Sequence, residues 1–459
     1  MKTKLDILSQ ISSLIGEKDT VEIADSIQCS ESEVTLEGIA VYLSHRRLPT
    51  SLVRMIFFFP KNHNGTFVLV GNGGLGSGLN YQRAHSLAEM GYAVVHTDTG
   101  SSRGLPSLYN NRDAIEDFGH RAVFSAYEIG QRFYRAIYEK APDYSYYWGG
   151  STGGQMGMSL VLRHPECFDG VIVGAPANPR LGVHLFFIWT YQKLRTKDPY
   201  HLPLFTREEC EAVHRVAIDF HRERGLMLPD DSNTIGYPVT DEADIDAFLD
   251  AVYKALPLSD EQKSALYDVY HGPRNEKTGE KIHAGLPIGT EFHHFGLYDS
   301  CATEVMLSHQ WLFHFIYGDN HDPLAFDFDR DYRHVVDLLA EPLNACDPDI
   351  SAYLGRGGKL LMFAGTADSV VPYKGTLDYV DAVRRTVNPE LLGNFTFYIA
   401  PTCWHNIASG PVSLIHRRDG GSVLDVMRAW VEQGKTPAEL IVNTKHEDGT
   451  FSELAVQPC

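Results

Sequence analysis

A glycine-rich turn with a serine at its centre is the feature that most constrains this chain. An aromatic, strand-like run at residues 144–148 leads into Gly-Gly-Ser-Thr-Gly at residues 149–153, and an amphipathic helical pattern follows. A strand, a tight turn and a helix with Ser151 at the apex match the Gly-x-Ser-x-Gly nucleophile elbow. The turn strains the serine backbone, so the residues two before and two after it need almost no side chain. The pattern predicts Ser151 as a nucleophile, beside helix-start N–H groups that can stabilise an oxyanion.

The length and charge of the chain bound its architecture and its partners. With 459 residues, we expect two domains or one large domain with an insertion, and a hydrophobic content of 43% is enough for a large core. A net charge of −19 argues against nucleic acid or an anionic membrane as partner. No stretch approaches the ~18 apolar residues of a membrane span. We therefore expect a small-molecule substrate, and the sequence leaves a homo-oligomer open.

Cysteine usage and the first residues bear on the compartment. The seven cysteines are scattered, odd in number and without a Cys-x-x-Cys pair, which indicates reduced thiols in a cytoplasmic protein. The N-terminal segment has an early acid at Asp6 and no sustained apolar run, so it predicts an amphipathic helix rather than a signal peptide. A chain whose leader has been removed would look the same.

Strand-like and helix-like segments alternate in the first and last parts of the chain. This alternation predicts a parallel, doubly wound sheet, and thus an α/β class. Residues 33–58 alternate in a β-like way, and the further expected strands are residues 66–70, 92–98, 144–148, 170–174, 359–365 and 395–399. The expected helices are residues 81–90, 119–140, 156–163, 373–385 and 423–433.

Between about residues 180 and 340 the alternation is lost, and aromatic and histidine residues with Pro/Gly breaks take its place. We interpret this stretch as an inserted lid domain. A parallel sheet interrupted after the nucleophile helix is typical of an α/β-hydrolase fold. The expected division is a first core part at 1–180, the lid at 181–340 and a second core part at 341–459.

In this fold the acid and then the histidine follow the nucleophile, each on a loop after a strand. Only three histidines remain after the strand at 359–364, and His405 is the one that follows a strand by a short loop. His416 and His446 lie in polar runs, where we expect solvated side chains. Asp368 comes directly after the preceding strand. Any one of these residues alone would suit an ordinary loop, but Ser151, Asp368 and His405 together predict a catalytic triad.

A second glycine motif, Gly71-x-Gly73-x-x-Gly76, also follows a strand. It resembles a dinucleotide fingerprint, with Asp98 ending the next strand, and would suit a nucleotide-dependent oxidoreductase. However, the helix starts late, whereas the third glycine should open it. We expect this loop instead to bring the backbone N–H of Gly74 or Leu75 to the oxyanion, beside the N–H of Thr152.

The inserted stretch supplies candidates for substrate contact. Aromatic side chains near residues 184–191 and 292–295 could clamp an aromatic acyl group, and the candidates are Trp189, Tyr191, His293 and Phe295. The alternative is that they form the core of the lid itself. A metal pair at His293 and His294 lacks a third ligand at suitable spacing, so we predict no metal and no cofactor.

Taken together, the motifs resemble the tannase and feruloyl esterase family, in order from about residue 55 to 443. They are GNGGLG (71–76), TDTG (97–100), DFGHRA (117–122), SYYWGGSTGGQ (145–155), FDGVIVGAPAN (168–178), HGPRNEKTG (271–279), DPDIS (347–351), GGKL (357–360), GTADSVVP (365–372) and WVEQGKTP (430–437). The resemblance implies an α/β-hydrolase with a large lid that cleaves esters of hydroxybenzoic or hydroxycinnamic acids. It implies the triad roles for Ser151, Asp368 and His405.

Two departures from the family pattern stand out. Members typically carry a cysteine just before the serine and another just after the histidine, joined as a disulfide, but this chain has Gly150 and Asn406 there. Many members also have a calcium loop in the lid. The stretch at 218–241 lacks its closely spaced acids and glycines, so Asp230 and Asp231 would make a poor calcium site.

The residues thus predict acyl transfer through a serine ester intermediate. Two alternatives remain open at this point. One is an ester or lactone hydrolase acting on a non-phenolic acyl group, such as a polyketide or hydroxyalkanoate ester. The other is a non-catalytic binding protein that keeps the fold.

Overall fold

The computed structural model describes residues 4–28, 35–76, 78–239, 241–302, 311–318, 322–405, 415–416, 421–446 and 448–459.

Within these residues a nine-stranded sheet has the order β1-β2-β3-β5-β4-β6-β7-β10-β11. Its strands are β1 Thr20–Gln28, β2 Thr35–His45, β3 Val53–Pro60, β4 Thr66–Val70, β5 Ala93–Thr97, β6 Tyr144–Gly150, β7 Gly170–Gly174, β10 Lys359–Gly365 and β11 Phe395–Ala400. From β5 to β11 neighbouring strands are parallel, and β1, β2, β3 and β5 pair antiparallel.

The sheet is buried on both faces, which explains why its strands are continuous apolar runs. Successive side chains of β3 show this, because Phe57 and Phe59 belong to the core on one face and Phe58 to the core on the other. Phe57 packs edge-on against Phe133 at 5.0 Å between ring centroids. The predicted α/β class and parallel sheet are confirmed, whereas β1 was not predicted.

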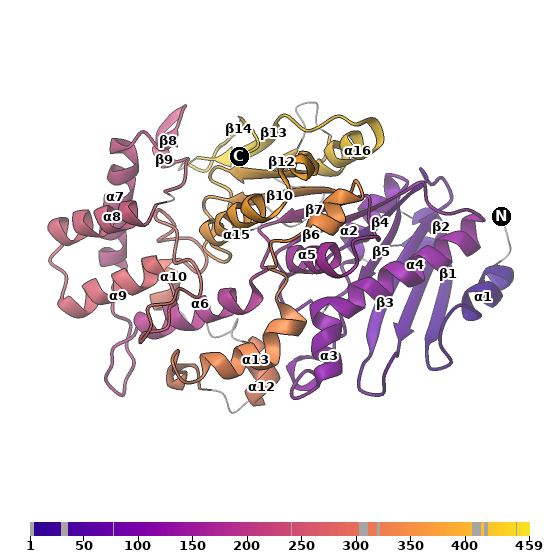
Figure 1. Cartoon of the computed structure of the whole chain (residues 1–459), viewed down its shortest axis with the longest axis horizontal. Coiled ribbons are helices and arrows are strands. Elements are labelled where there is room, and N and C mark those ends of the chain that lie inside the picture. The colour runs from indigo at the N-terminus through magenta and orange to yellow at the C-terminus, as the bar shows by residue number, and fades with distance from the viewer. Residues whose placement is uncertain are drawn as a thin grey trace.

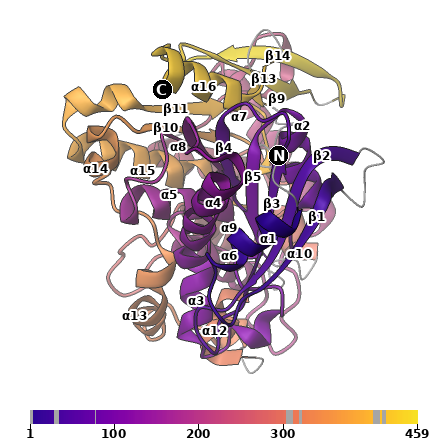
Figure 2. The same cartoon turned by 90° about the vertical axis from the view of Figure 1, so that its right-hand side faces the viewer.

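Helices cover both faces of the sheet (Figure 2). One face packs against α1 Lys4–Ser12, α4 Ala122–Tyr138, α5 Thr152–Arg163 and α15 Tyr373–Thr386. The other packs against α2 Tyr81–Glu89, α16 Val423–Gln433 and a small sheet of β12 Ile415–His416, β13 Leu440–Lys445 and β14 Phe451–Val456. Short α3 Arg112–Glu116 and α14 Ser351–Gly355 complete the core.

The rest of the chain forms a mainly helical region, residues 180–343. Its elements are α6 Arg180–Lys193, α7 Arg207–Glu223, β8 Met227–Leu228, β9 Asp231–Ile235, α8 Glu242–Ala255, α9 Asp260–His271, α10 Leu297–Ala302, α12 Trp311–Tyr317 and α13 Tyr332–Leu343. Of these, α7, α8 and α9 lie at one end of the molecule, while α12 and α13 lie beside α3 (Figure 1). Part of the region has a hydrophobic core of its own, built around Phe248, Leu266 and Phe295.

The small C-terminal sheet corrects one expectation. His446 follows β13 and was expected in a solvated tail, but its side chain is only 11% exposed. Its Nδ1 lies 3.1 Å from Asp231 Oδ2 and its Nε2 2.8 Å from Ser452 Oγ. The expectation was wrong because the hairpin of β13 and β14 brings His446 against β9 of the helical region. The side chain of His416 lies outside the described part of the chain.

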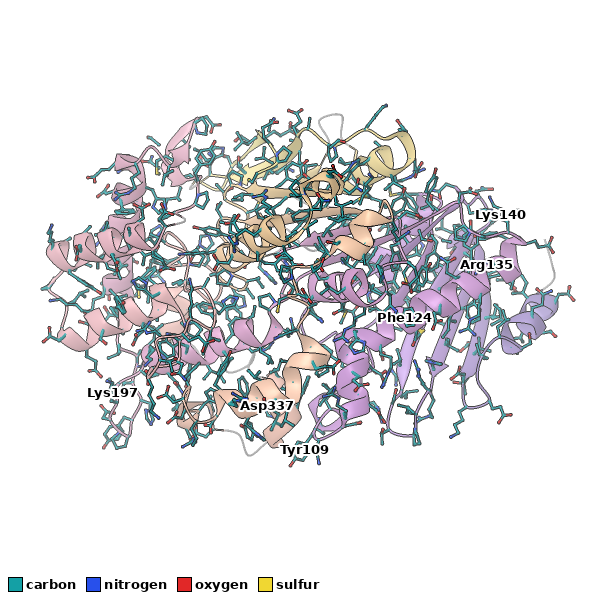
Figure 3. All side chains as sticks on the ribbon, in the orientation of Figure 1. Tyr109, Phe124, Arg135, Lys140, Lys197 and Asp337 are labelled. Carbon is teal, nitrogen blue, oxygen red and sulfur yellow. The ribbon has the colours of Figure 1, made fainter. Side chains whose placement is uncertain are left out.

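Many charged side chains lie at the surface of the protein. Exposed side chains such as Lys140, Lys197 and Asp337 project from the ribbon (Figure 3). In the part of the chain that the structure describes, no helix has the length and apolarity needed to cross a membrane.

Candidate active site

The turn between β6 and α5 has the geometry of a nucleophile elbow. Ser151 sits at φ 57° and ψ −120°, a conformation that non-glycine residues rarely adopt, and its N–H donates to the carbonyl of Gly174 at 2.9 Å. A Cβ on Gly149 would lie 2.6 Å from the carbonyl oxygen of Gly153, and one on Gly153 would lie 2.8 Å from that of Asn72. Both glycines are therefore required by the close approach of backbone, as the motif predicted.

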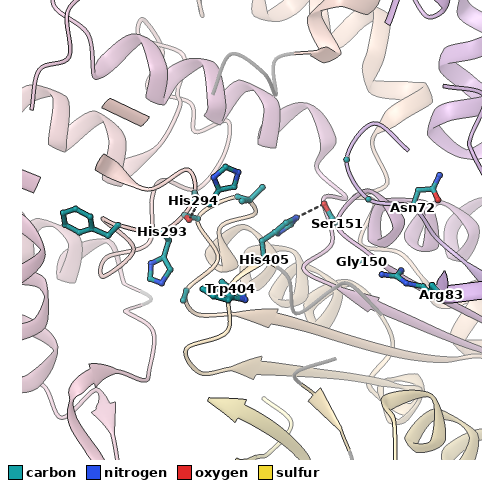
Figure 4. Close-up of a pocket in the computed structure, with 14 residues that line it drawn as sticks. Asn72, Arg83, Gly150, Ser151, His293, His294, Trp404 and His405 are labelled. Carbon is teal, nitrogen blue, oxygen red and sulfur yellow. Dashed lines mark hydrogen bonds between the residues drawn. The ribbon is translucent and has the colours of Figure 1, made fainter. Parts of the chain in front are cut away.

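Three side chains form a hydrogen-bonded chain that begins at this turn. His405 Nε2 lies 2.9 Å from Ser151 Oγ (Figure 4), and His405 Nδ1 lies 2.8 Å from Asp368 Oδ2. Asp368 is fully buried, and its other oxygen accepts the N–H groups of Val370 and Val371, both at 2.9 Å. A carboxylate on Nδ1 favours the tautomer whose Nε2 can accept the serine proton.

The order of the strands explains why these residues meet. Ser151, Asp368 and His405 follow β6, β10 and β11, and β7 alone separates β6 from β10 in the sheet. The carboxyl ends of parallel strands share one edge, so the loops after them are neighbours. The triad predicted from the sequence is thus brought together within hydrogen-bond distance.

Backbone contacts hold the two triad loops against each other. The N–H of Ala367 donates to the carbonyl of Cys403 at 3.1 Å, and the N–H of Thr402 donates to Thr366 Oγ1 at 2.9 Å. The Cys403 thiol is buried and free, and burial raises its pKa. Gly150 borders the cavity described below, whereas Asn406 lies outside the described residues.

The glycine loop lies next to the start of α5, where the oxyanion site was predicted. Thr152 Oγ1 donates to the carbonyl of Gly74 at 2.6 Å, which fixes the loop to the elbow. Arg180 Nη2 donates to Thr152 Oγ1 at 2.8 Å and to the Gly74 carbonyl at 3.4 Å. Leu75 contacts a different segment, since its carbonyl accepts a hydrogen bond from Ser101 Oγ at 2.6 Å. Of the three candidates, Thr152 and Gly74 are therefore in direct contact.

Arg180 is a functional candidate that sequence reasoning missed. It is only 3% exposed, and burial lowers the pKa of its guanidinium to about 9, so it is still mostly protonated at neutral pH. A charged residue that opens an otherwise apolar helix, α6, was the available signal.

A cavity of about 600 Å³ opens at the hydroxyl of Ser151. Its wall combines the elbow, the glycine loop, the triad loops and a segment of the helical region (Figure 4). The lining residues are Asn72, Gly73, Gly74, Arg83, Gly150, Ser151, Phe292, His293, His294, Ala367, Ser369, Val370, Trp404 and His405. A second cavity of about 340 Å³ adjoins it and shares Phe292, His293, Ala367 and Trp404.

Of the four substrate-contact candidates, only His293 lines these cavities. Trp189 is fully buried, where its Nε1 donates to the carbonyl of Asp268 at 2.8 Å and its ring packs edge-on against Phe328. Phe295 is fully buried against Phe187.

Tyr191 is also in the core, with the guanidinium of Arg195 over its ring at 4.5 Å. Trp189 and Tyr191 belong to the core because α6 is apolar on nearly all sides and is enclosed, whereas Phe295 lies outside α6 and packs into the core of the helical region. The structure instead points to Phe292, one residue before His293, and to Trp404, which precedes His405 and is 36% exposed. The position of Trp404, directly before the predicted catalytic histidine, was the sequence feature that could have identified it as a cavity residue.

Metal-ligating side chains do not gather in the described ranges, where no group of three or more His, Cys, Asp or Glu could hold an ion.

The Asp231 carboxylate accepts hydrogen bonds from Thr234 Oγ1 at 2.5 Å and the N–H of Asn233 at 2.9 Å. With His446, these donors lower its pKa to about 2.

Comparison with known proteins gives a consistent match. A model of the family "Tannase and feruloyl esterase" matches residues 50–219 and 256–455. A probable feruloyl esterase B-1 of Aspergillus terreus is 26% identical over 433 residues, covering 89% of this chain and 79% of the relative. Two crystal structures share the fold. Feruloyl esterase B from Aspergillus oryzae has a TM-score of 0.80 at 21% identity, over 99% of this chain and 95% of that one. Tannin acyl hydrolase from Aspergillus niger has a TM-score of 0.69 at 18% identity, over 98% and 91%.

Proposed function

The chain belongs to the tannase and feruloyl esterase family of carboxylic ester hydrolases, and we propose that it cleaves an ester of a hydroxybenzoic or hydroxycinnamic acid with Ser151 as nucleophile. The observation that carries this proposal is the hydrogen-bonded chain from Ser151 through His405 to Asp368, at the opening of a cavity of about 600 Å³ lined in part by Phe292 and Trp404. The family membership supports the reaction class, and the geometry supports the assignment of residues.

The reaction proceeds in two steps. His405 Nε2 takes the proton of Ser151 as the serine oxygen attacks the ester carbonyl, and Asp368 stabilises the imidazolium. The alcohol leaves with that proton, and an ester between the acyl group and Ser151 remains. Water activated by His405 then attacks this ester, releasing the acid and regenerating the serine hydroxyl.

Backbone N–H groups of Thr152 and of Gly74 or Leu75 stabilise the negative charge on the carbonyl oxygen during both steps. The contact between Thr152 Oγ1 and the Gly74 carbonyl supports this role, because it fixes the glycine loop beside the helix start. A buried cation, Arg180, adds favourable electrostatics at the same place.

An aromatic acyl group suits the cavity wall. Phe292 and Trp404 provide aromatic faces, and His293 adds a polar edge. Aromatic rings stack favourably on such faces, and hydroxyl groups of the acid can hydrogen-bond to the histidine. The names of the relatives, feruloyl esterase and tannin acyl hydrolase, support the same substrate class.

A panel of esters tests the proposal. We expect kcat/KM for methyl ferulate or methyl gallate to exceed that for methyl butyrate by at least tenfold, and Ser151→Ala to abolish turnover of all of them. Fluorophosphonate labelling of the wild-type protein and circular dichroism of the variant provide the controls. A preference for the aliphatic ester would favour a non-phenolic acyl group instead.

Three further assignments complete the proposal. The helical region, residues 180–343, acts as a lid that carries Phe292 and His293 to the substrate. The six described cysteines are free, which supports a cytoplasmic location. A homo-oligomer is compatible with the chain, and sedimentation velocity measures the assembly state.

A further inference from the structure

Arg83 is a cation in the cavity wall that the proposed chemistry does not use. It belongs to α2 and lies on the other side of Ser151 from His293 (Figure 4). Its Nε is buried without a hydrogen-bond partner. Among the described residues, its guanidinium forms no ion pair, and the hydrogen bond to Asn80 Oδ1 comes from the backbone N–H of Arg83 and not from its side chain.

In the part of the chain that the structure describes, no carboxylate is paired with Arg83. His96 lies nearby and is buried, and burial together with the charge of Arg83 lowers its pKa to about 4, so it is neutral at pH 7. Tyr147 is also buried, its hydroxyl donates to the carbonyl of Gly153 at 2.6 Å, and burial raises its pKa. Desolvation lowers the pKa of Arg83 itself. An arginine desolvated in this way is unfavourable unless an anion pairs with it.

We propose that Arg83 binds a carboxylate of the substrate, so that the preferred ester carries a free carboxylate in addition to the bond that is cleaved. The planar guanidinium matches a carboxylate in a bidentate geometry, which a neutral amide of the same shape cannot replace. The protein has a net charge of −19, so it does not attract anions at long range, and the preference arises from this contact. This inference rests on the proposed ester hydrolysis at Ser151.

The carboxylate can belong to the alcohol part or to the acyl part of the ester, and two matched substrate pairs separate these sources. Feruloyl glycolate and feruloyl glycolamide differ only by a carboxylate in the alcohol part. The methyl esters of 4-carboxycinnamic and 4-carbamoylcinnamic acid differ only in the acyl part. We expect wild-type kcat/KM to favour the carboxylate member of one pair by about 10- to 100-fold, as for a hydrogen bond between charged groups.

Two variants and a control locate the effect. Arg83→Met should lower kcat/KM for the carboxylate member of the preferred pair at least about tenfold more than for the neutral member, which removes the preference, while Arg83→Lys, which keeps the charge but loses the fork, should retain part of it. Arg385→Met, at an exposed position of α15, makes the same change in net charge and should leave the preference intact. Equal rates for both members of both pairs in wild type would overturn the inference. So would an equal loss on both members in Arg83→Met, which indicates a structural role.

Binding provides a readout that does not depend on turnover. Calorimetric titration of Ser151→Ala with feruloyl glycolate and feruloyl glycolamide, and with the two cinnamate esters, should give a carboxylate preference that Ser151→Ala/Arg83→Met lacks. If no ester is hydrolysed by wild type but this preference persists, the proposed function fails and the assignment of Arg83 stands. If hydrolysis occurs and neither pair shows a preference in binding, the assignment of Arg83 fails alone.

Discussion

Asp368 favours one tautomer of the histidine that contacts Ser151. Its Oδ2 lies 2.8 Å from His405 Nδ1, and its Oδ1 is occupied by two backbone N–H groups. Since both oxygens accept, the ring must donate from Nδ1 and accept at Nε2. Replacing the carboxylate with an amide of equal size reverses this arrangement without creating a cavity.

We therefore predict that Asp368→Asn lowers kcat by about 10⁴-fold, because the amide donates to Nδ1 and leaves a proton on Nε2. KM and the melting temperature should change little, since Oδ1 can still accept the N–H groups of Val370 and Val371. Steady-state kinetics and thermal unfolding measure both. A kcat within tenfold of wild type would show that Asp368 does not set the tautomer.

Arg180 is a second single side chain that supports the site, because it donates hydrogen bonds to Thr152 Oγ1 and to the Gly74 carbonyl. We predict that Arg180→Met lowers kcat by about 10- to 100-fold with KM nearly unchanged, because the loop it fixes is needed in the transition state. Arg195→Met is the matched control. Arg195 is also buried, but it donates to the carbonyl of Ser300 inside the helical region, so its loss should reduce stability and leave kcat unchanged. Equal effects of the two variants on kcat would contradict the role of Arg180.

At the scale of elements, a buried carboxylate joins the helices that carry the cavity wall. Glu291 is fully buried and accepts from His214 Nδ1 at 2.7 Å, from the Tyr270 hydroxyl at 2.8 Å and from the N–H of Gly289 at 2.9 Å. It therefore connects α7 and α9 to the segment with Phe292. Burial alone would raise the pKa of Glu291, but the hydrogen bond and charge of His214, followed by the other two donors, outweigh burial and lower it.

We predict that Glu291→Gln lowers the free energy of unfolding by about 2 kcal/mol at pH 7, because hydrogen bonds to a charged acceptor are weakened. The pKa of Glu291 in the folded protein lies below the ordinary glutamate value of 4.5. The stabilisation is thus fully present above pH 4.5 and is lost as the pH falls through the folded pKa. Urea unfolding of both proteins at pH 7, 5.5 and 4 measures it. A difference that grows between pH 5.5 and pH 4 would refute the assignment.

The sequence predicted those helices, strands and turns whose residue pattern is contained in one short stretch of the chain. Strands β4 to β7 are apolar runs bounded by turns, and the elbow needs glycines for reasons that a short motif expresses. Asp368 and His405 were found because chain order places them after consecutive strands. By contrast, the small sheet around His446 and the cavity positions of Arg83 and Arg180 depend on contacts between distant segments. The same holds for Trp189, because an aromatic residue on a helix has the same pattern whether it lines a cavity or fills a core.

At the scale of the whole molecule, the site depends on packing between loops and not on a covalent link. The resemblance implied a disulfide beside the triad in other members, whereas Gly150 stands at one of those positions here. Hydrogen bonds between the segments of Asp368 and His405, such as that from Ala367 to Cys403, hold the loops instead. The described cysteines, 167, 210, 301, 346, 403 and 459, are free.

We therefore predict that adding a thiol reductant leaves the activity unchanged and shifts the melting temperature by no more than about 1 °C. A reductant lowers stability only by breaking a disulfide that constrains the chain. Thiol titration of the denatured, unreduced protein should find at least the six described thiols. Loss of activity on reduction, or a lower thiol count, would show that a disulfide supports the site.

We propose that Ser151 carries the acyl group during hydrolysis. The most direct measurement is mass spectrometry of protein mixed with 4-nitrophenyl ferulate and quenched in acid within the first turnover. We expect a feruloyl adduct on the peptide that contains Ser151, which disappears on longer incubation and never forms in Ser151→Ala. An adduct on another residue, or full turnover by Ser151→Ala, would contradict it.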